Sequence, residues 1–295
     1  MTALRWIAVC LLLVSLTAGT IGDSAPRHPR MFLGGYHVLA TDFHVHSFPL
    51  SWATLAPWET VIEARQQGLD AIAIVGHNHV WVSKVGRWFS RLAGGPLVLT
   101  GEEVVSAHYH LLAIGIESTV DWRQTAASAI DQVHREGGVA IAAHPAASYW
   151  PAYDATAIQA LDGAEILHPA AYESDSIAAQ FRQFYNRAPL TAIGDSDFHG
   201  LGPVGLCRTY VFTEEETQPG ILNAVRHGRT VVYDRTGRAY GDPTWIRLAA
   251  QGGLPEVASR AVLSPGLLTW LSRIAGIFGL IAIVISGLGT TWEMS

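Results

Sequence analysis

The stretch Thr41-Asp-Phe-His-Val-His-Ser47 decides how the rest of the chain is interpreted. It continues the apolar run at residues 38–40, so the pattern predicts the end of a buried β-strand. His44 and His46 are two positions apart, and side chains with this spacing point to the same face of a strand. Two imidazoles on one face, with Asp42 on that face as well, form half of a metal site.

The composition is that of a folded domain with additional membrane segments. Of 295 residues, 49% are hydrophobic and 15% are charged. The formal net charge is −6 with histidine neutral, so no basic surface for nucleic acid is expected. Cys10 and Cys207 are not expected to pair, because Cys10 lies in an apolar N-terminal run. The 13 histidines are informative, since many stand beside Asp, Glu or another His.

Both ends of the chain carry membrane signals. Arg5 precedes an apolar run at residues 6–18, and residues 1–22 are interpreted as a signal peptide or an uncleaved anchor. Residues 265–291 are predicted to form a transmembrane helix, because about 20 apolar residues at 1.5 Å each cross a bilayer core of about 30 Å. The chain is therefore expected at the cell membrane, held there by one or two helices.

The orientation in the membrane has two conflicting signals. An N-terminal signal places the middle of the chain outside the cytoplasm. The arginine distribution indicates the opposite, because Arg5 alone lies beyond the apolar runs and four arginines lie on the domain side. These four are Arg27, Arg30, Arg260 and Arg273. We favour an extracytoplasmic domain, because a signal sequence is read first.

The middle of the chain alternates apolar strands with helices. Strands are predicted at residues 38–45, 71–75, 97–100, 110–116, 139–143, 164–167, 190–193 and 209–212. Helices are predicted at residues 58–68, 121–137, 173–187 and 214–228. Seven or eight such units in about 200 residues indicate an α/β barrel. The predicted domain spans residues 36–235, and a linker or juxtamembrane segment follows at 236–262.

Polar residues gather where these predicted strands end or begin. They are Gly76-His77-Asn78-His79, Gly101-Glu-Glu103, His110, His144-Pro145 and Gly194-Asp-Ser-Asp-Phe-His-Gly200. Each piece by itself is compatible with an ordinary turn. A barrel brings the carboxyl ends of its strands to one rim, so we expect these side chains to form a polynuclear metal site.

At these residues the chain resembles the PHP (polymerase and histidinol phosphatase) superfamily of metal-dependent phosphoesterases. The resemblance covers residues 36–234, and the family's motifs appear in order. They correspond to Asp42-Phe-His-Val-His-Ser47, Gly76-His-Asn78, Gly101-Glu-Glu103 with His110-Leu-Leu and His144-Pro145, and Asp197-Phe-His-Gly200.

The resemblance implies a distorted (β/α)7 TIM-like barrel that binds two or three Mn, Fe or Zn ions. Mixed imidazole and carboxylate ligands suit these metals without selecting among them. The implied ligands are His44, His46, Glu103 and Asp197 for one ion, His110 and His144 with bridging Glu103 for a second, and His77 and His199 for a third.

One departure from the family pattern concerns the third ion. The second motif of the family usually reads Thr-Asp-His-Asn, whereas Val75 and Gly76 stand in place of Thr-Asp here. A carboxylate ligand is therefore missing, unless His79, Asp195 or His108 takes its place. We expect two ions, and a third only with such a replacement.

The implied reaction is hydrolysis of a small phosphomonoester or phosphodiester by a metal-activated hydroxide. His199 or His77 is expected to protonate the leaving group. Arg208 either clamps a phosphate oxygen or forms an ion pair at the rim. His168, where relatives tend to carry Asn, either faces the substrate or only lines the rim. The partner is thus a small phosphorylated substrate, with no nucleic acid expected and no protein partner inferable.

Two alternatives stay open. The first is a non-catalytic, membrane-anchored sensor that binds metal or a phosphorylated ligand, and the missing carboxylate at Gly76 keeps this alternative in play. The second is an amidohydrolase-like metal hydrolase on a similar barrel. It fits the histidine spacing less well, and Lys84, the only lysine, is misplaced for a carbamylated bridging ligand.

Overall fold

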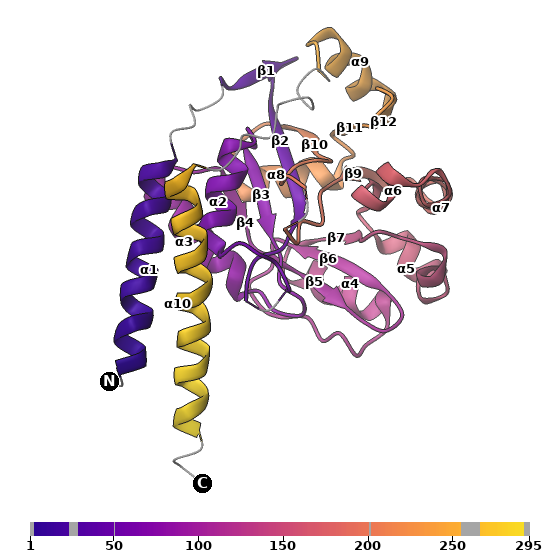
Figure 1. Cartoon of the computed structure of the whole chain (residues 1–295). Helices are drawn as coiled ribbons and strands as arrows, with labels where there is room; N and C mark the ends of the chain where they lie inside the picture. The colour runs from indigo at the N-terminus through magenta and orange to yellow at the C-terminus, as the bar shows by residue number, and fades with distance from the viewer. Residues whose placement is uncertain (1–2, 24–28, 50, 201, 255–265, 292–295) are drawn as a thin grey trace.

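Two β-sheets form the centre of the computed structural model, which describes residues 3–23, 29–49, 51–200, 202–254 and 266–291 (Figure 1). The first sheet has seven strands: β1 (Met31–Leu33), β2 (Tyr36–Val45), β3 (Ala71–Ile74), β4 (Leu97–Leu99), β10 (Thr209–Thr213), β11 (Thr230–Tyr233) and β12 (Ala239–Gly241). The second sheet has five: β5 (Gly101–Val105), β6 (His110–Ile114), β7 (Val139–Ala142), β8 (Gly163–Leu167) and β9 (Thr191–Gly194).

Helices surround the sheets and begin where the sequence supplies capping residues. α4, α5 and α8 start after Thr125, Asp154 and Thr217, whose side chains accept hydrogen bonds from the first turn. The helices are α1 (Ala3–Gly22), α2 (Pro57–Gln66), α3 (Trp81–Ala93), α4 (Ala126–Arg135), the 3-10 helix η1 (Ala147–Ala152), α5 (Ala155–Ala160), α6 (Pro169–Glu173), α7 (Asp175–Tyr185), α8 (Gln218–Arg226), α9 (Pro243–Gln251) and α10 (Leu267–Thr291).

The fold is mixed α/β, and the predicted closed barrel is not found among the described residues. The chain leaves the first sheet after β4 and enters the second at β5, and these two strands do not pair. β10 runs antiparallel to β2, and β6 runs antiparallel to both β5 and β7. A (β/α) barrel needs parallel strands throughout, so these reversals explain why the strands form two sheets instead.

An apolar core fills the space between the two sheets. Leu39 and Phe43 from β2 lie in one buried cluster with Leu112 and Ile141 from the second sheet. Burying each such side chain contributes about 1.5–3 kcal/mol. The core therefore holds the two sheets in a fixed relation, and with them the strand ends that carry polar side chains.

The eight predicted strands are confirmed as β2, β3, β4, β6, β7, β8, β9 and β10, with ends shifted by a few residues. The structure adds β5 where a turn was expected, and it adds α3, β1, β11 and β12. The segment predicted as a linker contains β12 and α9, and β12 pairs with β11 along residues 239–241. Residues 255–265, with Arg260, and also Arg27 lie outside the described residues.

The predicted membrane segments are helices α1 and α10, which lie side by side (Figure 1). Both are long and apolar enough to cross a membrane. Only 22% of the most apolar stretch of α1 and 33% of that of α10 is buried. Large side chains such as Leu13 and Phe278 are each 58% exposed. An exposed apolar surface of this extent is typical of membrane or partner contact.

A polar cluster joins this helix pair to α2. Trp58 Nε1 donates a hydrogen bond to Ser15 Oγ (2.8 Å), and Ser272 Oγ donates to Glu59. Arg273 pairs with Glu63 at 2.7 Å. These contacts connect α1, α2 and α10, so the two apolar helices are packed against the domain rather than detached from it.

Replacing Glu59 by Gln is expected to flatten the pH dependence of stability. Burial raises the pKa of Glu59 from 4.5 to about 8. The folded state therefore binds this proton more tightly, and the stabilisation, complete below pH 4.5, is lost as pH rises towards 8 at up to about 1.4 kcal/mol per unit. Thermal unfolding of the full chain in detergent at pH 5 and pH 8 measures the difference. An unchanged pH slope in Glu59→Gln would contradict this assignment.

Candidate metal centre

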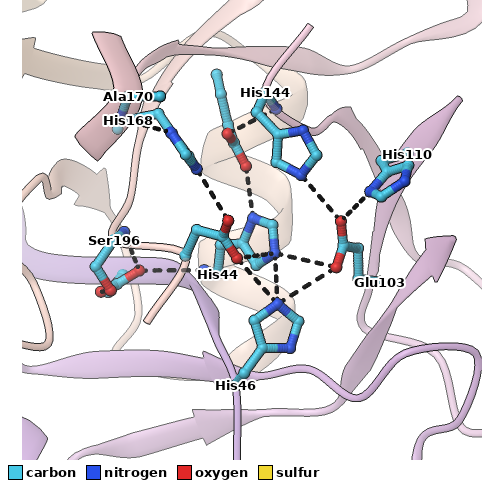
Figure 2. Close-up of polar contacts among 12 residues, drawn as sticks. His44, His46, Glu103, His110, His144, His168, Ala170 and Ser196 are labelled. Carbon is cyan, nitrogen blue, oxygen red and sulfur yellow. Dashed lines mark hydrogen bonds and ion pairs between the residues drawn. The ribbon is translucent and has the colours of Figure 1, made fainter. Parts of the chain in front are cut away.

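Ten histidine and acidic side chains meet where strands of both sheets end or begin, and Figure 2 shows part of this cluster. The sequence predicted eight of them: His44, His46, His77, Glu103, His110, His144, Asp197 and His199. The other two are Glu165 in β8 and Asp195, which directly follows β9. The structure thus brings every predicted metal ligand to a single cluster, although they lie in or follow six different strands.

Glu103 in β5 lies at the centre of the cluster. Its Oε2 atom is 3.4 Å from His44 Nε2, 3.3 Å from His46 Nε2 and 3.3 Å from His77 Nε2. Its Oε1 atom is 2.7 Å from His110 Nδ1 and 3.1 Å from His144 Nε2. One carboxylate therefore separates two groups of imidazoles, which is the arrangement that a bridging ligand requires.

The first group of ligand atoms fits one metal ion. His44 Nε2 and His46 Nε2 are 2.9 Å apart and lie 3.1 and 3.0 Å from Asp197 Oδ1. Four ligand atoms at 2.0–2.1 Å around a tetrahedral ion are about 3.4 Å from one another. The spacing of 2.9–3.4 Å among these atoms and Glu103 Oε2 is close to that value. The donor set, two imidazoles and two carboxylates, suits Mn, Fe or Zn.

A second and a third group flank the first. His44, Glu103 and His144 offer ligand atoms within 4.8 Å of one another, with His110 on the same oxygen of Glu103. On the other side His46, His77 and His199 form a group of three imidazoles at the same spacing. The third group contains no carboxylate of its own, as the absence of aspartate at position 76 predicted.

The space beside Gly76 is filled by His79. A Cβ atom built on Gly76 would lie 2.0 Å from Cε1 of the His79 ring. Both ring nitrogens of His79 are buried without a hydrogen-bond partner among the described residues, and the ring stacks on Trp81. Burial lowers the pKa of His79 to about 4, so the ring is neutral and has a free lone pair at neutral pH. Of the three predicted replacements for the missing carboxylate, His79 lies closest to its position.

The electrostatics of the cluster favour bound positive charge. Burial acts to lower the pKa of His44, but Asp197, Glu103 and Glu165 outweigh it and hold that pKa well above 6.5. Burial acts to raise the pKa of Glu103, but His44 and the hydrogen bonds from His110 and His144 hold it well below 4.5. Without metal, protons on the imidazoles balance the negative charge of the carboxylates. A bound divalent cation would displace these protons.

Glu165, which the sequence did not reveal, and His168, which was left between two roles, contact the ligand side chains from behind. Glu165 Oε1 lies 2.7 Å from His44 Nδ1, so it fixes the tautomer that leaves Nε2 free to bind metal. His168 accepts a hydrogen bond from Ala170 N at Nδ1 and donates from Nε2 to Asp197 Oδ2 at 3.1 Å. His168 therefore lines the rim and orients Asp197. A lone carboxylate inside the apolar strand Gly163–Leu167 was the available sequence signal for Glu165.

Asp42 does not serve as a metal ligand. Its two oxygens accept hydrogen bonds from His44 N, Ser196 N, Ser196 Oγ and Gly205 N, at 2.6–3.1 Å. These contacts connect β2 to the loop after β9, which carries Asp197. Asp42 thus holds two ligand-bearing segments together, and its predicted place in the metal site is corrected to a structural one.

Arg208 also lies outside the cluster. It donates hydrogen bonds to the carbonyl oxygens of Gly205 (2.9 Å) and Gln67 (3.3 Å) and is only 9% exposed. Arg208 directly precedes β10, and its hydrogen bond to Gln67 directs the guanidinium to the C-terminal end of α2. The expectation that Arg208 clamps a phosphate is therefore replaced by a structural role.

Backbone strain is concentrated beside the cluster. The non-glycine residues with positive φ in the described chain are Trp52 (54°), Asn78 (58°), His144 (27°) and Asp197 (43°). Two of them are predicted ligands, and the other two lie in loops that border the cluster. Such conformations cost about 1–3 kcal/mol each and occur preferentially at functional sites.

Comparison with known proteins finds one matching family model and a solved structure of similar fold. Residues 179–230 match the family model of PHP-associated sequences. A protein of Bacteroides vulgatus ATCC 8482, described as a two-domain protein "containing predicted PHP-like metal-dependent phosphoesterase", has a TM-score of 0.57 at 22% identity, over 77% of this chain and 74% of that one. An amidohydrolase of Chromobacterium violaceum, solved with bound sulfate and no metal, has a TM-score of 0.44 at 16% identity, over 56% and 89%. No curated protein matches the chain significantly.

The likeness to the Bacteroides vulgatus protein shows the fold, and residues 179–230 resemble PHP-associated sequences. Both findings support the resemblance of the motifs to the PHP superfamily.

Proposed function

We propose that this protein is a metal-dependent phosphoesterase acting on a phosphomonoester or phosphodiester. The observation that carries the proposal is Glu103, whose two oxygens face two separate groups of imidazoles. When bound, a pair of divalent ions would supply an activated water and neutralise charge that develops on a phosphoryl group. His44, His46 and Asp197 would hold one ion with Glu103, and His110 and His144 would hold the other.

The residues at the mouth of the cluster handle the substrate and protons. His199 Nδ1 donates a hydrogen bond to the carbonyl of Asp197 at 2.9 Å, which leaves its Nε2 with a lone pair. Burial lowers the pKa of His199, so the neutral ring can hold a third ion or relay a proton. The side chains of His77 and His199 are 28% and 34% exposed, so both can reach a leaving group.

The phosphoesterase proposal has two competitors. An amidohydrolase-like reaction uses the same donor chemistry, but the structure offers no lysine at the cluster: Lys84 pairs with Glu117 on the surface. A sensor would bind metal without turnover. The strained backbone at His144 and Asp197 favours an enzyme, because strain of this kind accompanies catalytic preorganisation.

An activity assay separates these functions. The full chain in detergent is incubated with Mn, Fe or Zn and with p-nitrophenyl phosphate, bis(p-nitrophenyl) phosphate and an amide panel. We expect phosphoester turnover that His144→Ala abolishes and that His134→Ala leaves intact, because His134 pairs with Asp162 on the surface of α4. Metal bound without any turnover would identify a sensor, and turnover of amides alone would identify an amidohydrolase.

We further propose that α1 and α10 both anchor the protein at the cell membrane, with the domain outside the cytoplasm. Ser15 is fully buried between α2 and α10, so cleavage after α1 would expose the Trp58 and Glu59 contacts. We therefore expect the mature protein to retain α1. Intact-mass spectrometry should give the full 31.8 kDa, and a mass lacking residues 1–22 would contradict retention.

A further inference from the structure

The direction of the two apolar helices relative to the metal centre is fixed by their contacts with α2. Along α1, Ser15 touches Trp58, and Asp23 lies 3.4 Å from Arg65. α1 therefore runs in the same direction as α2. Its remaining residues 3–14 continue past the N-terminal end of α2, and they lead to the end marked N in Figure 1.

α10 runs in the opposite direction and passes the same point. Arg273 pairs with Glu63, and Gly276 lies against Ala56 and Trp58, 3.5 Å from a Cβ built at Gly276. From there α10 continues to Thr291, about 22 Å at 1.5 Å per residue. Both helices thus project beyond the N-terminal end of α2 (Figure 1).

The N-terminal end of α2 is also the end of the domain at which the metal centre opens. His46 directly follows β2, and the described residues 47–49 and 51–56 lie between it and α2. This connecting loop is fastened to the centre: Ser51 Oγ accepts a hydrogen bond from His77 N (3.1 Å), and Thr54 lies against Gly200. The loop therefore occupies a fixed position between the mouth of the centre and the projecting helices.

This loop presents an exposed tryptophan. Trp52 is 89% exposed and has a positive φ of 54°. Exposing its apolar ring to water and holding its backbone in this conformation both cost free energy. Trp81, 37% exposed, stands at the start of α3 at the same end of the domain. Tryptophan is enriched at membrane–water interfaces, where its ring lies at headgroup level.

We infer, on the basis of the phosphoesterase function proposed above, that the substrate is a phosphoester headgroup of a membrane amphiphile. The two projecting helices enter the bilayer on the side of the mouth. The mouth of the centre then faces the headgroup layer, with Trp52 at the interface. A phosphate carried at the bilayer surface reaches His77 and His199 without leaving the membrane.

The first test measures orientation and does not depend on turnover. A spin label is placed at Trp52→Cys or, as the distant control, at Phe32→Cys, in a Cys10→Ser background; Cys207 is buried. Phe32 lies in β1, which pairs with the opposite end of β2. In phosphatidylcholine nanodiscs with a nickel-chelating lipid, we expect stronger relaxation at position 52. Equal or weaker relaxation there would overturn the inference.

The second test compares one headgroup in two physical states. At equal phosphate concentration, the Mn-loaded full chain in nanodiscs is expected to hydrolyse phosphatidic acid at least about tenfold faster than glycerol 3-phosphate. The enzyme and phosphatidic acid are held on the same membrane surface, which raises the effective substrate concentration. Trp52→Ser should lower the ratio of phosphatidic acid to p-nitrophenyl phosphate turnover, and Trp88→Ser, on the exposed side of α3, should not.

The outcomes of the second test distinguish this inference from the proposed function. Faster hydrolysis of glycerol 3-phosphate, or a ratio unaffected by Trp52→Ser, overturns the inference and leaves the phosphoesterase in place. Absence of turnover on all three phosphoesters overturns the proposed function, and the inference about the substrate fails with it. The spin-label experiment still decides the orientation in that case.

Discussion

Glu103→Gln should abolish activity and remove at least one metal ion per chain. The amide keeps the shape of Glu103 but loses the charge that faces five imidazoles within 3.4 Å. A bridged metal pair contributes several kcal/mol of transition-state stabilisation, so turnover is expected to fall about 10³-fold. Metal content by mass spectrometry and turnover of p-nitrophenyl phosphate measure the two effects.

The neighbouring residue supplies a matched control for this experiment. Glu102 is equally buried, but it points to the other face of β5 and accepts a hydrogen bond from Val120 N at 2.6 Å. Burial raises the pKa of Glu102 to about 7, so a neutral amide is close to its native state. Glu102→Gln should keep metal and activity. Loss of metal in both variants would show that β5 is merely sensitive to substitution, and retention in Glu103→Gln would refute the bridging role.

Gly76→Asp should be destabilising, although it restores the aspartate that is usual in the family. The new Cβ would lie 2.0 Å from the His79 ring, and a buried carboxylate would be added where a ring already fills the space. Overpacking of this kind costs about 1–3 kcal/mol before the cost of the charge. Thermal unfolding of the metal-loaded chain should show a lower midpoint, with no gain in metal.

Removing His79 in the same chain should reverse that effect. Gly76→Asp with His79→Ala opens the space for the carboxylate next to His77 and His199, so the third group gains a negative ligand. We expect stability to recover and metal content to rise by one ion relative to Gly76→Asp alone. If His79→Ala alone removes a metal ion from the wild-type background, then His79 is itself a ligand. If the double variant is no more stable and binds no more metal than Gly76→Asp, then an aspartate at position 76 does not take the place of His79.

The ligand cluster was largely predictable because its signals are local. His44 and His46 share a strand face. Most of the other ligands stand at or shortly after a strand end, where an apolar run meets a polar residue, and Glu103 lies inside β5. Sheet topology places such ends together whatever the details of strand order. This is why all eight predicted ligands are in one cluster even though the closed barrel was not confirmed.

The parts that escaped prediction depend on contacts between distant segments. Glu165 stands 121 residues from His44, and only their 2.7 Å contact shows its role. Arg208 was expected to clamp a phosphate or to form an ion pair at the rim, whereas its hydrogen bonds go to the carbonyl oxygens of Gly205 and Gln67. β5 contains two glutamates and begins with glycine, and its pairing with β6 makes it a strand. The filling of the Gly76 space by His79 depends on a turn that the sequence does not specify.

The pairing of α1 with α10 also sets an order for assembly in the cell. α1 leaves the ribosome before the domain, and α10 leaves it after. The Trp58 contact with Ser15 needs only α1 and α2, whereas Glu59 and Glu63 receive Ser272 and Arg273 only once α10 is made. Docking of α10 therefore completes this polar cluster last, and a chain interrupted before Leu267 should leave Glu63 without its ion-pair partner Arg273.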